Sequence, residues 1–304
     1  MSFLSAPYFH DEADAFKELE ANLWPHGPVC PRCGGMDRIT AVKGGRMGLR
    51  RCGPCKRQFT VTVGTVFESS HVPLHHWLQA VYLLCSSKKG ISSHQLMRIL
   101  DVQYKTAWFM THRIREAMAS GKLPPIGGEG AVVEIDETFI GQKADMPKQR
   151  GYAHKHAVMT LVERGGPARS FHVDGTSAAD LLPIIKANVA PDTYVMTDEA
   201  GQYAHLNKHF TGHEFVTHGK GEYVRVDVHT NTLESFYSVF KRGMKGVYQH
   251  CAEKHLHRYV AEFDFRYNNR VRLGVDDGER AARAVRGAMG KRLMYRRIDE
   301  TIAI

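Results

Sequence analysis

Apolar residues recur with helical spacing between residues 74 and 119. LHHWLQAVYLLCSS (74–87) places its large apolar side chains along one stripe, which predicts an amphipathic helix. SSHQLMRILDV (92–102) predicts a short helix that Ser92 or Ser93 caps, and QYKTAWFMTHRIREAMAS (103–120) predicts a longer one. A short helix, a tight turn and a longer helix are the order of a helix-turn-helix, with an ordinary three-helix bundle as the alternative.

The second helix of that motif carries residue types that suit phosphate and base-edge contacts. From this helix we select four candidate DNA contacts: Lys105, Thr106, Arg113 and Arg115. GKLPPIGGEG (121–130) then interrupts the helical pattern, and its Gly and Pro content marks a linker between domains.

Beyond the linker the pattern changes to strands followed by helices. AVVEIDETFI (131–140) predicts a strand, and a Gly-Gly-Pro turn joins two further strands into a hairpin. The predicted strands cover 131–140, 156–165, 168–175, 193–200 and 213–218, and the predicted helices cover 176–189, 201–210, 231–250 and 253–270. This order predicts an α/β domain in which helices pack on a mixed five-stranded sheet.

Carboxylates stand at three separated points of this pattern. Asp136 lies within the first strand, Asp198 at the end of the fourth, and Glu234 in the helix after the fifth. Burying an unpaired carboxylate is expensive, so three acids from separate elements make sense if they converge on metal ions. Mg²⁺ prefers oxygen ligands, and two such ions suit an in-line phosphoryl transfer. We therefore expect Asp136, Asp198 and Glu234 to bind catalytic Mg²⁺ or Mn²⁺.

Two other acids accompany Asp136 in its strand. We expect alternation to put Glu134 and Glu137 on the opposite face from Asp136, so neither is expected to be a ligand. At 100° per residue, Glu234 shares a stripe of its helix with Lys241 and Lys245, which places phosphate-binding cations beside the acid. Lys241, Arg242 and Lys245 are therefore further candidate DNA contacts.

Four of the six cysteines form two pairs, CPRC (Cys30, Cys33) and CGPC (Cys52, Cys55), separated by 18 residues. This spacing is typical of a structural zinc site, whereas two disulfides or a redox pair are less compatible with it. We expect about one zinc per chain, in a ribbon with a basic surface. KRQFTVTVGTVF (56–67) alternates like a strand and is expected to follow the second pair.

The 304 residues include 41 Lys and Arg against 32 Asp and Glu, a net charge of +9, which is compatible with a nucleic-acid partner. The chain has no apolar run of 18 residues, and its N-terminus is acidic and lacks a signal-like stretch. We therefore expect no membrane partner and a cytoplasmic protein, associated with the bacterial nucleoid when it binds DNA.

Three motifs together resemble the DDE transposases of bacterial insertion sequences: EIDETFIG, VMTDEAGQY and HTNTLESFYSVFKRGMKGVY. The resemblance runs from about residue 15 to 270. It implies a ribonuclease-H-like fold, terminal inverted repeats and target DNA as substrates, and a homo-oligomer on DNA. By motif, Asp136, Asp198 and Glu234 take the acid positions and Lys241 the basic one. Some relatives use the Asn of the HTNT segment, here Asn231, as the third ligand; charge and spacing favour Glu234.

The expected organisation is a zinc ribbon with an N-terminal helix, a helix-turn-helix-like region, a linker, the ribonuclease-H-like domain and a C-terminal helical tail. These parts are expected at residues 1–70, 71–120, 121–130, 131–275 and 276–304. The expected function is cleavage of transposon ends and transfer of the 3′-hydroxyl into target DNA. Two alternatives stay open: a domesticated, non-catalytic DNA-binding regulator, and a metal-dependent nuclease without strand transfer.

Overall fold

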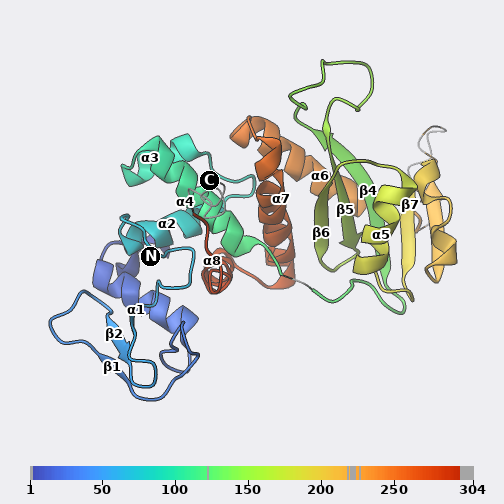
Figure 1. Ribbon diagram of the computed structural model, residues 1–304. Helices are drawn as coiled ribbons and strands as arrows, with labels where there is room; N and C mark the ends of the chain where they lie inside the picture. Colours follow the sequence, from blue (N-terminus) through green and yellow to red (C-terminus); the bar gives the residue numbers. More distant parts are fainter. Residues whose placement is uncertain (1–2, 122, 218, 220–223, 226, 295–304) are drawn as a thin grey trace, which may run out of the picture. The chain divides into compact units, whose positions relative to one another are not determined.

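The computed structural model describes residues 3–121, 123–217, 219, 224–225 and 227–294. Contacts divide the chain into two compact units, Met1–Ala119 with Gly274–Ile304, and Ser120–Leu273 (Figure 1). The last part of the chain, which the sequence analysis treats as a separate tail, therefore belongs to the first unit. No helix among the described residues combines the length and the apolar character that a membrane crossing requires.

The first unit consists of a small three-stranded sheet and a group of helices. Its strands are β1 (Ile39–Ala41), β2 (Arg50–Cys52) and β3 (Gln58–Phe59), paired antiparallel in the order β1-β2-β3. Its α-helices are α1 (Glu12–Leu23), α2 (Leu74–Ser86), α3 (Ser93–Leu100), α4 (Tyr104–Met118) and α8 (Asp277–Arg286), preceded by short 3-10 turns at Phe3–Ser5 and Pro7–Phe9.

The strand expected over residues 56–67 is wrong beyond β3, because turns follow Phe59. Threonine side chains compete here with a strand ladder: the Thr65 hydroxyl donates to the Thr62 carbonyl at 2.7 Å, and the Thr60 and Thr62 hydroxyls lie 2.8 Å apart. Gly64, at φ +77°, completes the turn in a conformation that glycine adopts without strain. Alternation of residue types alone therefore overstates this strand.

Side chains from distant parts of the sequence satisfy both ends of α2. Its N-cap Pro73 offers no side-chain cap, and Glu12 of α1 instead accepts hydrogen bonds from the Leu74 and His75 amides at 2.8 and 3.2 Å. At the other end, the buried Arg280 of α8 donates to the Cys85 carbonyl at 3.1 Å. A carboxylate at the N-terminus and a cation at the C-terminus both complement the helix dipole.

The predicted order of short helix, turn and longer helix is present in α3 and α4. Ser92 caps α3 by accepting the Gln95 amide, and Asp101 ends it in a left-handed conformation at φ 50°. Three residues after Asp101, α4 begins at Tyr104. The His94 and Tyr104 rings stack at a centroid distance of 4.4 Å across the turn, which fixes the start of α4 against α3.

The second unit contains a five-stranded sheet in the order β6-β5-β4-β7-β8. β4 pairs antiparallel with β5 and parallel with β7; β5–β6 is antiparallel and β7–β8 is parallel. The strands are β4 (Val132–Ile140), β5 (His156–Glu163), β6 (Ala168–Val173), β7 (Tyr194–Asp198) and β8 (Gly212–Val216). Its α-helices are α5 (Ala178–Asn188), α6 (Asn231–Gly243) and α7 (Glu253–Asn268). The predicted mixed five-stranded sheet is confirmed.

Two predicted helices have a different form in the structure. Residues 201–210 form two 3-10 turns, Gly201–Tyr203 and Leu206–Lys208, instead of one helix. The long helix expected over 231–250 is α-helical only to Gly243 and continues as a π-helix, Met244–Tyr248. The glycine at 243, weakly helix-forming, lies where the hydrogen-bond pattern changes. Gln249, at φ 55°, then ends the helical path.

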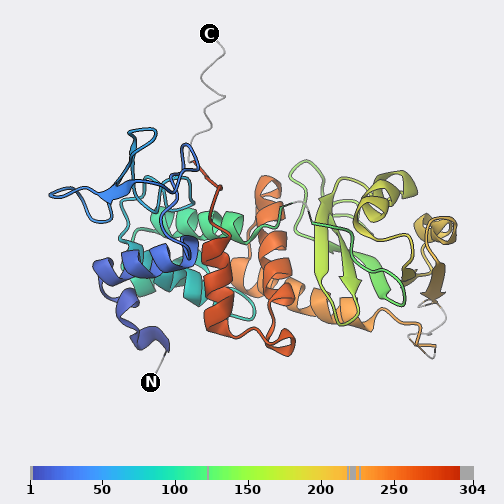
Figure 2. The same cartoon turned by 90° about the horizontal axis from the view of Figure 1, so that it is seen from below.

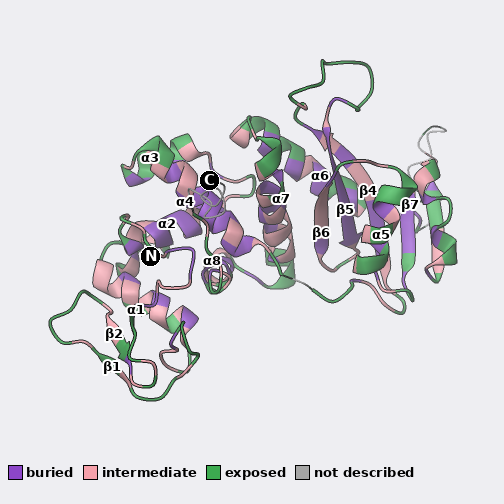
Figure 3. Cartoon of the chain, in the orientation of Figure 1, coloured by how far each residue is buried: buried purple, intermediate pink, exposed green. Residues whose placement is uncertain are grey.

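The sheet separates two hydrophobic cores. Odd-numbered residues of β4 and β5, such as Val133, Ile135 and Met159, pack with Leu181 and Ile185 of α5. Even-numbered residues of β4 and β5 face the core that α6 and α7 form with the sheet. This core contains Ile140, Val158 and Val162 of the strands and Leu233, Phe236, Phe240, Leu256 and Phe263 of the helices. Figure 2 shows α5 and α6 on opposite faces of the sheet, and Figure 3 shows β5 buried over most of its length.

Helix α7 also closes the outer edge of the sheet. The Asp264 carboxylate accepts hydrogen bonds from the Ser170 amide and hydroxyl at 2.7 and 2.6 Å. Asn268 accepts the Ala168 amide at 2.6 Å and donates to the Ala168 carbonyl at 2.9 Å. Unpaired groups of an edge strand are a template for wrong pairing, and α7 satisfies these groups in β6. Burial raises the pKa of Asp264 to about 7, against hydrogen bonds from Ser170 that lower it.

Candidate functional site

Strand register brings the first two acids side by side. β4 and β7 run parallel, with Val133 opposite Val195 and Glu134 opposite Met196. The pairing ends there, and Asp136 and Asp198 each lie two residues further along their strands. The negative charge of Asp198, the last residue of β7, raises the pKa of Asp136. Neighbouring strands lie about 4.8 Å apart, so the two carboxylates share one end of the sheet.

The electrostatics of Asp136 are those of a crowded acid. Desolvation and, after it, the negative charge of Asp198 raise the pKa of Asp136 to about 7, and Lys241 opposes this rise. Its Oδ1 accepts the Glu137 amide at 2.7 Å, and the Tyr237 hydroxyl donates to its backbone carbonyl at 2.5 Å. Such a pair of carboxylates is stable as two anions when a cation lies between them. This chemistry suits a divalent metal ion.

Glu137, which we did not expect to be a ligand, also lies near Asp198. It points to the α5 side of the sheet, as its odd position requires, where Gln202 Nε2 donates to Glu137 Oε1 at 3.5 Å. Burial raises the pKa of Glu137 to about 7, opposed by Tyr203, and Asp198 adds to the rise. The nearby negative charge of Glu137, after burial itself, raises the pKa of the buried Tyr203 hydroxyl. Glu137 and Asp198 are far apart in sequence, and only the fold brings their charges close together.

The face expected for Glu134 was wrong. Glu134 has the same parity as Asp136 and therefore faces the same side, toward α6. It is fully buried, and its Oε1 accepts from Arg164 Nε at 2.7 Å. Its Oε2 accepts the Leu233 amide at 2.9 Å, in the first turn of α6. Glu134 thus caps the helix that carries Glu234, and its burial is explained without a metal.

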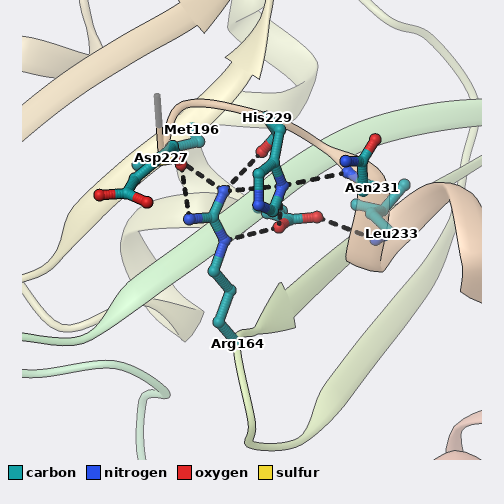
Figure 4. A network of polar contacts seen from close by, with 7 residues as sticks. Arg164, Met196, Asp227, His229, Asn231 and Leu233 are labelled. Atoms are coloured by element: carbon teal, nitrogen blue, oxygen red, sulfur yellow. Dashed lines mark hydrogen bonds and ion pairs between the residues drawn. The ribbon is translucent and has the colours of Figure 1, made fainter. Parts of the chain in front are cut away.

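Arg164 extends this connection to the segment before α6 (Figure 4). It donates to the Asp227 and His229 carbonyls, each at 2.7 Å, and its Nη2 lies 3.0 Å from His229 Nδ1. The same nitrogen lies 2.9 Å from Met196 Sδ on β7. One guanidinium therefore joins β7, the residues before α6 and, through Glu134, β4. We call Glu134, Arg164 and His229 the α6 anchor.

Glu134→Gln is expected to lower the free energy of unfolding by about 3 kcal/mol, because it leaves a guanidinium that has lost its buried counter-charge. Cleavage of DNA is expected to fall more than DNA binding, since the start of α6 loses its fixed position. Chemical unfolding and cleavage assays measure the two effects. Glu214→Gln, which breaks the exposed pair with Arg225 at 3.2 Å, is the matched control with a much smaller loss. Equal behaviour of the two variants would contradict the anchor.

The start of α6 carries both candidates for the third ligand. Asn231 is its first residue and Glu234 lies one turn later, and both side chains are exposed. Within the described residues, the groups whose ligand atoms all lie within 4.8 Å of one another do not include Asp136, Asp198 and Glu234 together. Lys241 lies over the Tyr237 ring at 5.8 Å, and Arg242 and Lys245 are exposed further along. Asp198 and Lys241 lie close enough to Asp136 for their charges to shift its pKa, and Glu234 is exposed in the first turn of α6.

The candidate DNA contacts on α4 fall into two groups. Lys105 is exposed and Thr106 half-buried in the first turn, next to the exposed Tyr104. Arg113 and Arg115 are only 6% and 1% exposed. These two candidates need correction, because side chains inside the first unit are not presented to DNA. At 100° per residue, positions 113 and 115 lie about 80° to either side of position 105, so helical spacing alone does not show that both are buried.

Arg113 has a structural role in place of the expected contact. It donates to the Glu68 carbonyl at 3.0 Å and to the Leu293 carbonyl at 3.1 Å, and lies 4.8 Å from the Phe109 ring centre. Arg98 and Tyr104, which were not among the candidate contacts, are exposed on either side of the turn between α3 and α4. Recognition helices contact bases through their N-terminal residues, and this rule points to Tyr104 and Lys105.

The four ribbon cysteines form one cluster. Cys30 Sγ lies 3.6 Å from Cys55 Sγ, and Cys33 Sγ lies 3.6 Å from Cys52 Sγ; all four sulfurs are within 4.8 Å of one another. Sulfurs in a tetrahedron with Zn–S bonds of about 2.3 Å are about 3.8 Å apart, whereas a disulfide needs about 2.05 Å. The geometry supports structural Zn²⁺ and excludes disulfides. Phe59 and Trp24 pack beside the cluster.

A zinc ribbon ahead of a ribonuclease-H-like sheet with paired aspartates defines a class: the insertion-sequence transposases. Two family models agree with this class. The transposase zinc-ribbon domain matches residues 10–58, and the ISXO2-like transposase domain matches residues 127–268.

A protein of Halobacterium salinarum described as an uncharacterized protein in transposable element ISH50 is 33% identical over 284 residues. The alignment covers 85% of this chain and 91% of that protein. The chain belongs to the ISXO2-like insertion-sequence transposases, and the resemblance stated from its motifs is confirmed.

Proposed function

We propose that this transposase hydrolyses the phosphodiester at each transposon end and then joins the freed 3′-hydroxyl to target DNA. The observation that supports the proposal is that the charge of Asp198 raises the pKa of the buried Asp136, in a chain of this family. In the first step a water oxygen bonds to phosphorus and the 3′-oxygen of the transposon end leaves. In the second step that 3′-hydroxyl bonds to a target phosphorus and the target's 3′-oxygen leaves.

The residues of the site fit divalent ions with oxygen ligands. Asp136, Asp198 and Glu234 would hold Mg²⁺ or Mn²⁺, because burial and the charge of Asp198 both disfavour an ionised Asp136 and a bound cation would offset both effects. The bound ions would supply charge neutralisation and a lowered pKa for the attacking water. Lys241 contributes a positive charge next to Asp136, where a DNA phosphate would bind. Asn231 would orient the third ligand or the phosphate.

The direct test of the function uses the DNA ends that flank the gene. The full chain is expected to nick these ends and to join them to a second DNA with Mg²⁺ present, and to do neither with a chelator present. Nicking without joining would support the nuclease alternative. Specific binding without nicking would support a non-catalytic regulator. Both transposon ends would have to be held in one complex before they are joined to the target, so we also propose a homo-oligomer on DNA.

Binding of Mg²⁺ is expected to strengthen as pH rises through about 7. Asp136, with a pKa raised to about 7, holds a proton below that pH in the folded chain, and a cation must displace it. The unfolded carboxyl loses its proton near pH 4, so between about pH 4 and 7 the metal-free folded state binds more protons and loses stability as pH rises. Thermal unfolding with and without Mg²⁺ at about pH 6 and 8 measures both effects. A Mg²⁺ shift independent of pH would contradict the assignment.

Recognition of the ends is assigned to the first unit. Lys105→Ala is expected to weaken binding of the ends about 5- to 10-fold and to lower the salt slope by about one, as for loss of one phosphate contact. Titration at several salt concentrations measures both. Lys17→Ala removes an equally exposed lysine from α1, where it pairs with Asp14, and is expected to change little. If both variants bind alike, α4 does not read the ends.

A further inference from the structure

A second group of metal-ligating side chains lies in the catalytic unit, apart from the acids. His156 is the first residue of β5, His172 lies next to the last residue of β6, and Glu253 is the first residue of α7. One ligand atom from each of the three side chains lies within 4.8 Å of the other two. Neither the family motifs nor the transposase chemistry uses these residues.

The sheet register explains why the two histidines meet. His172 pairs with Val158, and His156 lies two residues before Val158 on the same strand, so the histidines are diagonal neighbours on one face. That face is the one covered by α7, because Val158 belongs to the core with α6 and α7. The rings stand edge-to-face with centroids 5.6 Å apart. Both imidazoles therefore point at the first turn of α7, where Glu253 is.

The distances between the three ligand atoms are close to those between ligands of one metal ion. Glu253 Oε1 lies 3.4 Å from His156 Nδ1 and 3.7 Å from His172 Nε2. Ligands at about 2.0–2.1 Å from a tetrahedral zinc ion are roughly 3.4 Å apart. The separations are therefore close to those of a shared ion, and longer than a direct charge-assisted hydrogen bond of about 2.8 Å.

His156 supplies the independent observation. Its side chain is only 5% exposed, and within the described part of the chain its Nδ1 has no hydrogen-bond partner. Glu253 Oε1 is 3.4 Å away but is not aligned for a hydrogen bond. Leaving a buried imidazole nitrogen without a partner costs about 1–3 kcal/mol. A metal ion between Nδ1 and the carboxylate would satisfy both atoms at once.

The third side chain of the group is open to solvent. Glu253 is 53% exposed on its outer side, which leaves room for water as a fourth ligand.

We propose that His156, His172 and Glu253 bind one Zn²⁺-type divalent transition-metal ion, with water in the fourth position. Two imidazoles and a carboxylate are a ligand set that selects zinc and its neighbours over Mg²⁺. The ion ties the start of α7 to β5 and β6, and the Asp264 and Asn268 contacts hold the rest of α7 along the same edge. Asp136 is opposite Thr160, four residues along β5 from His156, so the site is separate from the acids by about 13 Å of strand.

Zinc content of the full chain, purified without a histidine tag, tests the proposal. The unchanged chain is expected to retain two zinc ions after dialysis, one in the ribbon and one at the histidines. His172→Gln and Glu253→Gln are each expected to retain one. Glu253→Gln replaces a half-exposed side chain by an isostere, so the helix start stays intact and circular dichroism checks the fold. His250→Gln, at an exposed position just before α7, is the matched control with two ions.

Cobalt substitution separates the two sites. The ribbon ion is expected to give an intense thiolate-to-cobalt charge-transfer band, and the second equivalent is expected to add visible bands without strengthening that band. Glu253→Gln should lose only the added bands. One retained zinc in the unchanged chain, or a second ion that persists in both Glu253→Gln and His172→Gln, would overturn the proposal. In the first case the three side chains are a plain polar contact.

Discussion

Asp136→Asn is expected to reduce cleavage of the transposon ends by at least about a thousandfold while specific DNA binding is retained. Removing one metal-binding carboxylate costs several kcal/mol of transition-state stabilisation, and each 1.36 kcal/mol is about tenfold in rate. Binding is unaffected, because Asp136 lies in the second unit and end recognition is assigned to the first. Single-turnover cleavage and DNA titration of the full chain measure the two quantities.

Glu199→Gln is the matched control for this experiment. Glu199 directly follows Asp198 but is exposed and accepts the Gly219 amide at 2.8 Å, so it is expected to keep most of the activity. If Asp136→Asn cleaves DNA at close to the normal rate, the acid pair is not the catalytic centre, whatever the result for Glu199.

Glu234→Gln is expected to lose cleavage about as fully as Asp136→Asn, whereas Asn231→Ala is expected to retain part of it. The reason is charge: two Mg²⁺ ions bring four positive charges, and Asp136, Asp198 and a scissile phosphate neutralise three of them. A third carboxylate completes the neutralisation, and a neutral amide does not. Both side chains are exposed at the start of α6, so substitution at either position leaves the core unchanged.

The opposite ranking, with Asn231→Ala inactive and Glu234→Gln active, would transfer the ligand role to Asn231. Glu234 is exposed in the first turn of α6, and its expected role as the third ligand is binding of Mg²⁺. Mg²⁺ titration of the two variants, followed by thermal unfolding, measures this without cleavage. A loss of the Mg²⁺ shift is expected in Glu234→Gln.

Much of the architecture could be predicted because each element carries its own signal. The apolar and β-branched runs in 131–140 and 156–165 correspond to β4 and β5, and the Cys-x-x-Cys pairs correspond to the sulfur cluster. The errors arose where local side-chain bonding competes with a regular pattern. The threonines after Phe59 form turns, and residues 201–210 break into 3-10 turns.

The site was less accessible to sequence because register and burial are properties of the fold. The face of Glu134 could have been predicted, because it lies two residues from Asp136 in one strand and therefore shares its face. The role of Arg164 was not predictable, because it contacts β4, β7 and the segment before α6, each distant in sequence. Arg113 and Arg115 show that a cationic residue on a predicted recognition helix indicates DNA only when its side of the helix is exposed.

The division of the chain into Met1–Ala119 with Gly274–Ile304 and Ser120–Leu273 makes the catalytic part an insertion with two covalent connections. A single protease cut near residue 120 would therefore leave both parts attached through the connection at residue 274. The helix beyond that connection supplies Arg280, which binds the Cys85 carbonyl at the end of α2. A premature stop codon just before residue 274 would thus leave the catalytic part whole and yet remove a structural piece of the N-terminal unit.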